Sequence, residues 1–134
     1  MSLTLSHQDK LTLRTAAYSA VTLLATAGAA GGSPHRIATD GSIALASATG
    51  PVGHVLAEKS TGVKLKGSSV AAIADQVLPA LTEAMSLLKK QDPAEADNFR
   101  GAVLVAVEAA IGKDGVSPTV ADIIRKITAV LDAV

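Results

Sequence analysis

The segment from Asp92 to Gly112, DPAEADNFRGAVLVAVEAAIG, constrains the fold more than any other part of the sequence. Asp92 is a good N-cap residue, Pro93 suits the first helical position, and Glu95 stands where a capping-box acid reaches back to the cap. Gly112 stands where a left-handed C-cap is needed. The segment therefore predicts a helix over residues 93–112.

The middle of this predicted helix is almost wholly apolar. From residue 102 to residue 110 only Glu108 carries a polar side chain. A helix on the surface of a globular protein shows a clear polar face, and this one shows little beyond Asp97, Arg100 and Glu108. We therefore expect other helices to enclose it on most sides, which would make it the central helix of the fold.

Capping serines and helical periodicity predict three further main helices. The expected ranges are 6–27, 69–90 and 117–133. Ser6 with Asp9 has the spacing of a capping box, and Pro118 after Ser117 fits the first helical position. Because only residues 113–116 separate the last helix from the central one, we expect these two to pack antiparallel.

The region from Gly28 to Gly67 carries weaker signals. Residues 28–39, GAAGGSPHRIAT, have the composition of a loop. Short helices are expected at 42–48, after Asp40 and Gly41, and at 51–59. The chain is thus predicted to form one all-α domain over residues 1–134, with four main helices and short helical turns between the first and second.

The alanine-rich composition excludes several classes of function. Twelve basic and twelve acidic residues cancel, so the phosphate neutralisation that drives nucleic-acid binding is lacking. One Phe and one Tyr cannot build a stacking platform for bases. The absence of cysteine rules out disulfides and thiolate metal sites.

The N-terminal helix has some features of a signal peptide, because Lys10 and Arg14 precede an apolar run that ends in small residues. Hydroxyl side chains interrupt that run, and the Ser6 cap favours a structural helix. No segment reaches the roughly 18–20 uninterrupted apolar residues of a membrane span. We expect a cytoplasmic protein that binds neither membranes nor nucleic acid.

A stripe of hydroxyl side chains follows the first helix at spacings of three and four. It consists of Thr12, Thr15, Ser19, Thr22 and Thr26. One interpretation is a face that contacts a ligand or a close partner helix. The other is a solvated face whose hydroxyls bond to carbonyls one turn earlier.

Residues 62–69, GVKLKGSS, have the glycine spacing of a phosphate-binding loop but lack the lysine after the second glycine. A weaker prediction remains. Lys64, Lys66 and Ser68 lie just before a helix N-terminus, where a small anionic ligand could bind. The alternative is a basic surface loop.

Three residues of the predicted central helix are candidate ligand-binding groups. Glu108 has apolar neighbours, so it would act as a general base or a ligand-binding acid. The alternative is a structural acid that pairs with Arg14 or Arg125 or lies exposed at the rim. Arg100 is expected to pair with Asp97 three residues earlier or to bind an anion. Asp97 and Glu108 are eleven residues apart, about 16 Å along a helix, so they cannot share a metal ion.

The sequence indicates no catalytic set, no cofactor and no metal site. His7, His35 and His54 have no second ligand at helical spacing. His7 stands at a helix start, and the other two are expected in loops. A small enzyme would need a cleft that joins His35 or His54 to a carboxylate.

Several segments resemble a family of small, alanine-rich, uncharacterised actinobacterial proteins. They are LRTAAY at 13–18, VLPAL at 77–81, DNFR at 97–100 and GVS at 115–117. Residues 102–131 also resemble the helical domains of the tellurite-resistance TerB type, in which an Asp-Gly turn joins two helices. Asp114 and Gly115 match that turn. The resemblance implies a stress response and an acidic metal site, but Thr119 or Val120 stands where a glutamate would follow.

Three functions follow in order of preference. The first is a non-catalytic cytoplasmic helical protein that acts by association, as a homodimer. The second is a small-molecule- or metal-responsive stress protein, in which Asp97, Arg100, Glu108 and Asp114 face a pocket. The third is a small enzyme with an unrecognised site.

Overall fold

The computed structural model describes residues 5–28, 34–57, 69–111 and 117–133, and every element within these ranges is an α-helix. The helices are α1 (His7–Gly28), α2 (Pro34–Ala46), α3 (Gly50–Ala57), α4 (Val70–Gln91), α5 (Pro93–Ile111) and α6 (Pro118–Ala133). The all-α prediction is confirmed, and the bounds of the four main helices agree with those expected. Gly112, the expected C-cap of α5, lies outside the described residues.

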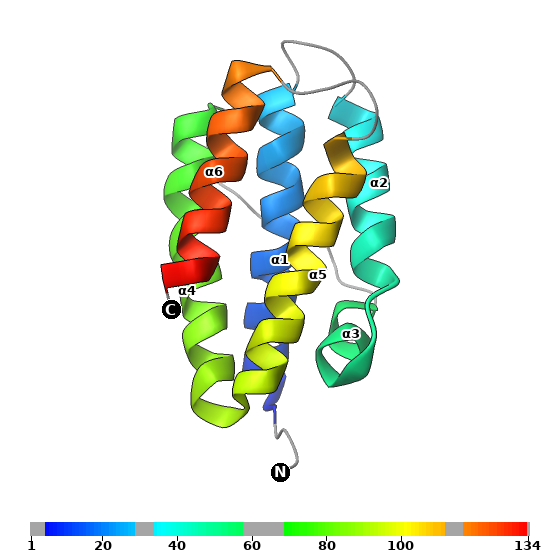
Figure 1. Ribbon diagram of the computed structural model, residues 1–134, viewed down its shortest axis with the longest axis vertical. Coiled ribbons are helices and arrows are strands. Elements are labelled where there is room, and N and C mark those ends of the chain that lie inside the picture. The colour runs from blue at the N-terminus through cyan, green and yellow to red at the C-terminus, as the bar shows by residue number, and fades with distance from the viewer. Residues whose placement is uncertain (1–4, 29–33, 58–68, 112–116, 134) are drawn as a thin grey trace.

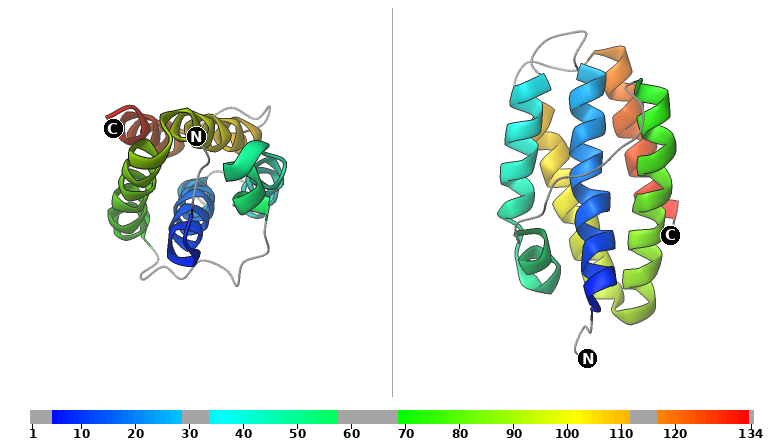
Figure 2. Two further views of the ribbon diagram at one scale, coloured as in Figure 1. Left: turned by 90° about the horizontal axis from the view of Figure 1, so that it is seen from below. Right: turned by 180° about the vertical axis from the view of Figure 1, so that it is seen from behind.

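The helices form two layers (Figures 1 and 2). One layer holds α2 with α3, then α1, then α4, and α5 and α6 lie across one face of it. In Figure 1, α5 runs diagonally from the end of α4 toward α2, and α6 runs in the opposite direction to α5. The prediction that α5 and α6 run antiparallel is confirmed. However, α6 packs mainly against α1 and α4 and contacts α5 less.

Among the four main helices, α1 has the largest buried share. Half of its 22 residues are buried, against about a third of the 19 in α5. Both helices contact every other helix, as expected of α5, and Val103 and Val107 of α5 are buried. However, Val105 is 56% exposed and Glu108 is exposed. Other helices therefore enclose only the inner face of α5, and not most of its circumference as the sequence predicted.

Hydroxyl groups of α1 bond to the helix backbone. The Thr22 hydroxyl donates to the Tyr18 carbonyl at 3.1 Å and the Thr26 hydroxyl to that of Thr22 at 3.0 Å. Ser19 is fully buried and donates to the Ala16 carbonyl at 3.1 Å. Because these bonds give each hydroxyl a partner within its own helix, the hydroxyl groups can lie in or beside the apolar core. The bonding that the second interpretation expects is confirmed for Ser19, Thr22 and Thr26. Its solvated face is wrong at Ser19, which is buried.

The predicted N-caps are present. The Ser6 amide donates to the Asp9 carboxylate at 3.1 Å, and the Asp9 amide donates to the Ser6 hydroxyl at 3.0 Å. Ser69 accepts a hydrogen bond from Ala72 at the start of α4, and Ser117 accepts one from Val120 at the start of α6. These bonds satisfy amides that have no partner within the helix.

The prediction for residues 34–42 is wrong. Residues 34–39, expected in a loop, form the first turns of α2, and Gly41 lies inside the helix and not before it. A Cβ on Gly41 would lie 2.8 Å from Cγ1 of Val21. Gly41 is therefore a packing residue that brings α1 and α2 close together. It has no role in a turn, and α2 is a helix of 13 residues.

Pro79 lies inside α4 without ending it. By length and composition, α4 is also the one helix among those described that is long and apolar enough to cross a membrane. This observation is weak evidence, because core helices of globular proteins pass the same criterion. Several of its apolar side chains, among them Leu81 and Leu88, are fully buried within the bundle.

Candidate functional site

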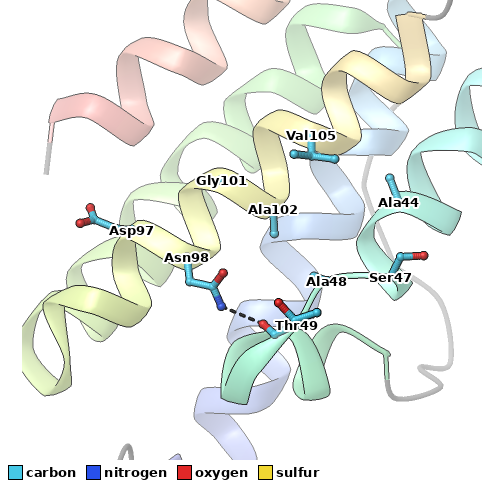
Figure 3. Close-up of a pocket in the computed structure, with 9 residues that line it drawn as sticks. All are labelled: Ala44, Ser47, Ala48, Thr49, Asp97, Asn98, Gly101, Ala102 and Val105. Carbon is cyan, nitrogen blue, oxygen red and sulfur yellow. Dashed lines mark hydrogen bonds between the residues drawn. The ribbon is translucent and has the colours of Figure 1, made fainter.

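A hollow of about 400 Å³ lies between the end of α2 and the middle of α5 (Figure 3). Its lining residues are Ala44, Ser47, Ala48, Thr49, Asp97, Asn98, Gly101, Ala102 and Val105. The first four come from the last turns of α2 and the link to α3, and the others follow one side of α5. The volume lies within the range of about 300–1,000 Å³ that ligand pockets span.

Side chains of α5 fix the link that forms one wall of the hollow. The Asn98 amide donates to the Thr49 carbonyl at 2.9 Å, as Figure 3 shows. Glu95 Oε1 accepts a hydrogen bond from the Val52 amide at 3.1 Å. An acid at a helix N-terminus satisfies a free amide and interacts favourably with the helix dipole. Glu95 was expected to reach back to Asp92, and that prediction is wrong because the carboxylate caps α3 instead.

Asp92 serves two helices. Its amide donates to the Leu88 carbonyl at 2.7 Å, which ends α4, and its carboxylate accepts from Ala94 at 3.1 Å, which begins α5. The N-cap prediction for Asp92 is therefore confirmed. Because the Asp92 amide is already satisfied by α4, Glu95 has no capping partner at that position and can reach across to α3.

Two glycines allow the chain to turn sharply into α3. Gly50 has a φ of +80°, a conformation that side chains other than glycine rarely adopt. A Cβ on Gly53 would lie 2.4 Å from the Ala48 carbonyl carbon and oxygen. The link between α2 and α3 therefore lies directly against α3, and it cannot shift to fill the hollow without disturbing that contact.

Tyr18 of α1 holds the other end of α3. Its hydroxyl donates to the Leu56 carbonyl at 2.6 Å. Burial disfavours the charged phenolate and so raises the pKa of Tyr18 above 10.0. Hydrogen bonds from side chains of two helices therefore hold α3 in place. Glu95 and Asn98 of α5 act at its beginning, and Tyr18 of α1 acts at its end.

Gly101 leaves open space on α5. A Cβ at this position would meet no atom within 4 Å. Glycine inside a helix costs about 0.5–1 kcal/mol relative to alanine, and nothing in the described core requires that cost at this position. Gly101 therefore leaves the hollow wider than it would be with an alanine, although the packing of the described helices would accept the alanine methyl.

Of the three predicted ligand-binding residues, only Asp97 lines the hollow. Asp97 is exposed, and its carboxylate points away from α2 at the rim (Figure 3). Arg100 does not pair with Asp97 as expected, because its Nε donates to Asp132 of α6 at 2.6 Å. Glu108 is exposed and is not among the lining residues, so it does not need the buried arginine partner that was considered for it.

The other predicted candidates are either outside the described residues or outside the lining of the hollow. Lys64, Lys66 and Ser68, expected to hold an anion, and Asp114 of the expected Asp-Gly turn lie outside the described residues. His7 is exposed at the start of α1. His54 is exposed within α3, and His35 belongs to α2, so neither stands in a loop as expected. The described part of the chain holds no group of three or more metal-ligating side chains.

The sequence analysis did not find the hollow. It requires Ala44 of α2 and Ala48 of the link to α3 to face Gly101 and Ala102 of α5, and alanine carries no local sign of such a pairing. One signal was present, however. Gly101 stands in the interior of a strongly predicted helix, where a glycine commonly has a packing or functional reason.

No protein-family model, curated protein or solved structure matches this chain. The resemblances to an actinobacterial family and to TerB-type domains therefore stay predictions, and the geometry of the hollow carries the functional argument.

Proposed function

We propose that this chain is a non-catalytic cytoplasmic helical protein that acts by association, as a homodimer through its α2–α5 face. This face consists of the hollow and Ile43, which lies one turn before Ser47 on the same side of α2. The observation that carries the proposal is the exposure of two large apolar side chains there. Ile43 is 60% exposed and Val105 is 56% exposed. Contiguous exposed apolar surface commonly marks an interaction site.

The face has the features of a symmetric contact. A two-fold dimer places the same patch on both subunits, so the patch must supply both the protruding and the receiving groups. Ile43 and Val105 supply the protruding side chains. The hollow around Gly101 and its neighbouring alanines would accommodate the same side chains of the second copy. The net charge of the chain is zero, so two copies do not repel each other at long range.

The test is sedimentation equilibrium of the full chain over a range of micromolar concentrations, with Val105→Lys as the disrupting variant. Leu11→Lys is the matched control, because Leu11 is the third large exposed hydrophobic residue in the described part of the chain, at 41%, and lies on α1. We expect a dimer for the parent chain and for Leu11→Lys, and a monomer for Val105→Lys with unchanged helical content. A monomeric parent chain would overturn the dimer, and a dimer that survives Val105→Lys would place its interface elsewhere.

The rival function is a small-molecule- or metal-responsive stress protein of the TerB type. In this function Asp97, Arg100, Glu108 and Asp114 would face one pocket. Of the three that the structure describes, only Asp97 lines the hollow, and Asp114 lies outside the described residues. A thermal-shift screen separates the rivals, because a ligand at a hundred times its dissociation constant adds about 2.7 kcal/mol to stability. A shift with divalent metals would favour the TerB type, and a screen without any shift would leave it unsupported.

A further inference from the structure

We propose that α3 is a hinged lid over one end of the core, which undocks as a single unit at Gly50 while the other five described helices stay packed. Three observations support this conformational device. The contacts that hold the other helices together do not pass through α3, side chains of two other helices bind its two ends, and a glycine hinge precedes its buried residues.

The other described helices contact one another without α3. Both α1 and α5 contact α2, α4 and α6 directly, and α4 also contacts α6. By comparison, α3 contacts α1, α2 and α5, and within the described part of the chain it contacts neither α4 nor α6. In Figure 1 it lies below α2, beside the beginning of α5. Undocking of α3 would therefore remove no direct contact among the remaining helices.

Three buried side chains and a hydrogen bond at each end hold α3 on the bundle. The side chains are those of Val52, Val55 and Leu56, and each is 3% exposed or less. The Val52 amide donates to Glu95 at 3.1 Å, and the Leu56 carbonyl accepts from Tyr18 at 2.6 Å. With eight residues, α3 is about two turns long, so it has no interior that could stay folded once one end is lost. The two ends should therefore be released together.

Gly50 separates this releasable helix from a fixed anchor. Its φ is +80°, and a residue at the end of an element that accepts large changes of φ and ψ is a common hinge. Just before it, the Thr49 carbonyl accepts a hydrogen bond from Asn98 at 2.9 Å, which keeps the link bound to α5. The hydrogen bonds of Val52 and Leu56 lie beyond it. The hinge thus falls between one bond that anchors the link and two that release α3.

This opening is compatible with a single unfolding transition of the chain. Native proteins open in cooperative units whose free energies lie below that of global unfolding. Because undocking of eight residues exposes far less surface than global unfolding, urea promotes it far less. Global unfolding therefore overtakes the opening before the open form accumulates. The opening is also independent of the proposed dimer, because α3 lies outside the α2–α5 face.

The test is native-state hydrogen exchange of the full chain, followed by ¹H–¹⁵N NMR at urea concentrations below the unfolding transition. We expect the amides of Val52, Val55 and Leu56 to exchange through one opening that depends weakly on urea. Amides of α4, such as those of Leu81 and Leu88, should exchange through global unfolding, which depends steeply on urea. Exchange of both sets with the same free energy and the same urea dependence would overturn the proposal.

Two variants that act at opposite ends decide whether α3 opens as a unit. Tyr18→Phe removes the hydrogen bond at Leu56, and Glu95→Gln weakens the one at Val52. Each variant should raise the exchange rates of Val52 and Leu56 by one common factor, roughly two- to tenfold. The double variant should multiply the two factors. A variant that accelerates exchange only at its own end would show fraying and would also overturn the proposal.

Ile127→Val is the matched control, because Ile127 is fully buried in α6, a helix that α3 does not contact in the described part of the chain. The lost methylene should accelerate the exchange of α4 amides roughly two- to tenfold. The exchange of α3 amides should not change, because their opening leaves α6 packed. If Ile127→Val accelerates both sets alike, α3 opens only with the whole bundle, and the proposal fails whatever the other variants show.

Discussion

Tyr18 gives the molecule a pH dependence that belongs to a single residue. Burial raises its pKa above 10.0 in the folded chain, so the folded state keeps its proton where the unfolded state has lost it. The contribution of protonated Tyr18 to the free energy of unfolding is therefore complete below about pH 10. It declines as pH rises through the pKa of Tyr18 in the folded state. Because Tyr18 is the only tyrosine and no tryptophan is present, phenolate absorbance reports it directly.

We expect an absorbance midpoint above 10.0 and a free energy of unfolding that falls across the same range of pH. Tyr18→Phe should lose about 0.5–1.5 kcal/mol at neutral pH, the usual worth of one hydrogen bond, and should remove this tyrosine contribution to the alkaline slope. A midpoint in the folded chain equal to that of a free tyrosine would contradict the burial of this hydroxyl.

Glycines provide a second prediction at this scale. Gly101→Ala should raise the free energy of unfolding by about 0.5–1 kcal/mol, because the added methyl meets open space and alanine is the better helix former. Gly53→Ala is the matched comparison, since its methyl would collide with the Ala48 backbone, and it should destabilise the chain. Urea denaturation measures both. A loss of stability in Gly101→Ala would show that the space at this position is already filled.

Among the elements, α3 depends most on side chains from elsewhere. It has only eight residues, and isolated helices of that length are marginal in water. Glu95→Gln removes the charge that its first turn receives, and should cost about 0.3–1 kcal/mol. Hydrogen exchange at Val52 should quicken, while amides of α4 should keep their protection.

Glu83→Gln is the control for this prediction, because Glu83 is an exposed acid of α4. It should change stability by less than about 0.5 kcal/mol and leave exchange in α3 unaltered. If Glu95→Gln also leaves the exchange of Val52 unaltered, the carboxylate does not cap α3 in solution.

The same elements show what the sequence could predict and what it could not. The beginnings of α1, α4 and α6 were predictable because Ser6, Ser69 and Ser117 each accept a hydrogen bond from the amide three residues ahead. The beginning of α2 was not, because Gly41 has the local appearance of a turn and its real reason is the side chain of Val21 on another helix. Likewise, Glu95 satisfies the local rule for a capping box but bonds to α3.

At the scale of the whole molecule, the layered arrangement explains why the degree of enclosure of α5 was overestimated. An unbroken apolar run resembles a helix surrounded on all sides, yet the outer side of α5 carries Val105 in solvent. Among the four main helices α1 has the largest buried share, and its threonines and Ser19 made it look less buried in the sequence. Of the candidate site, Asp97 alone was predictable, because the facing alanines of α2 are brought to it by tertiary packing.

Because α1 and α5 each contact every other helix, the described helices should unfold together. Phe99 is the only phenylalanine and is fully buried, so Phe99→Ala should cost about 3–5 kcal/mol. That is a large share of the roughly 5–15 kcal/mol that stabilises a typical domain. Urea unfolding followed by circular dichroism and by Tyr18 fluorescence should give one coincident transition in the parent chain, displaced equally for both probes in Phe99→Ala. An earlier loss of the Tyr18 signal would mean that α3 separates from α1 before the bundle melts, and the chain would then contain two cooperative units in place of one.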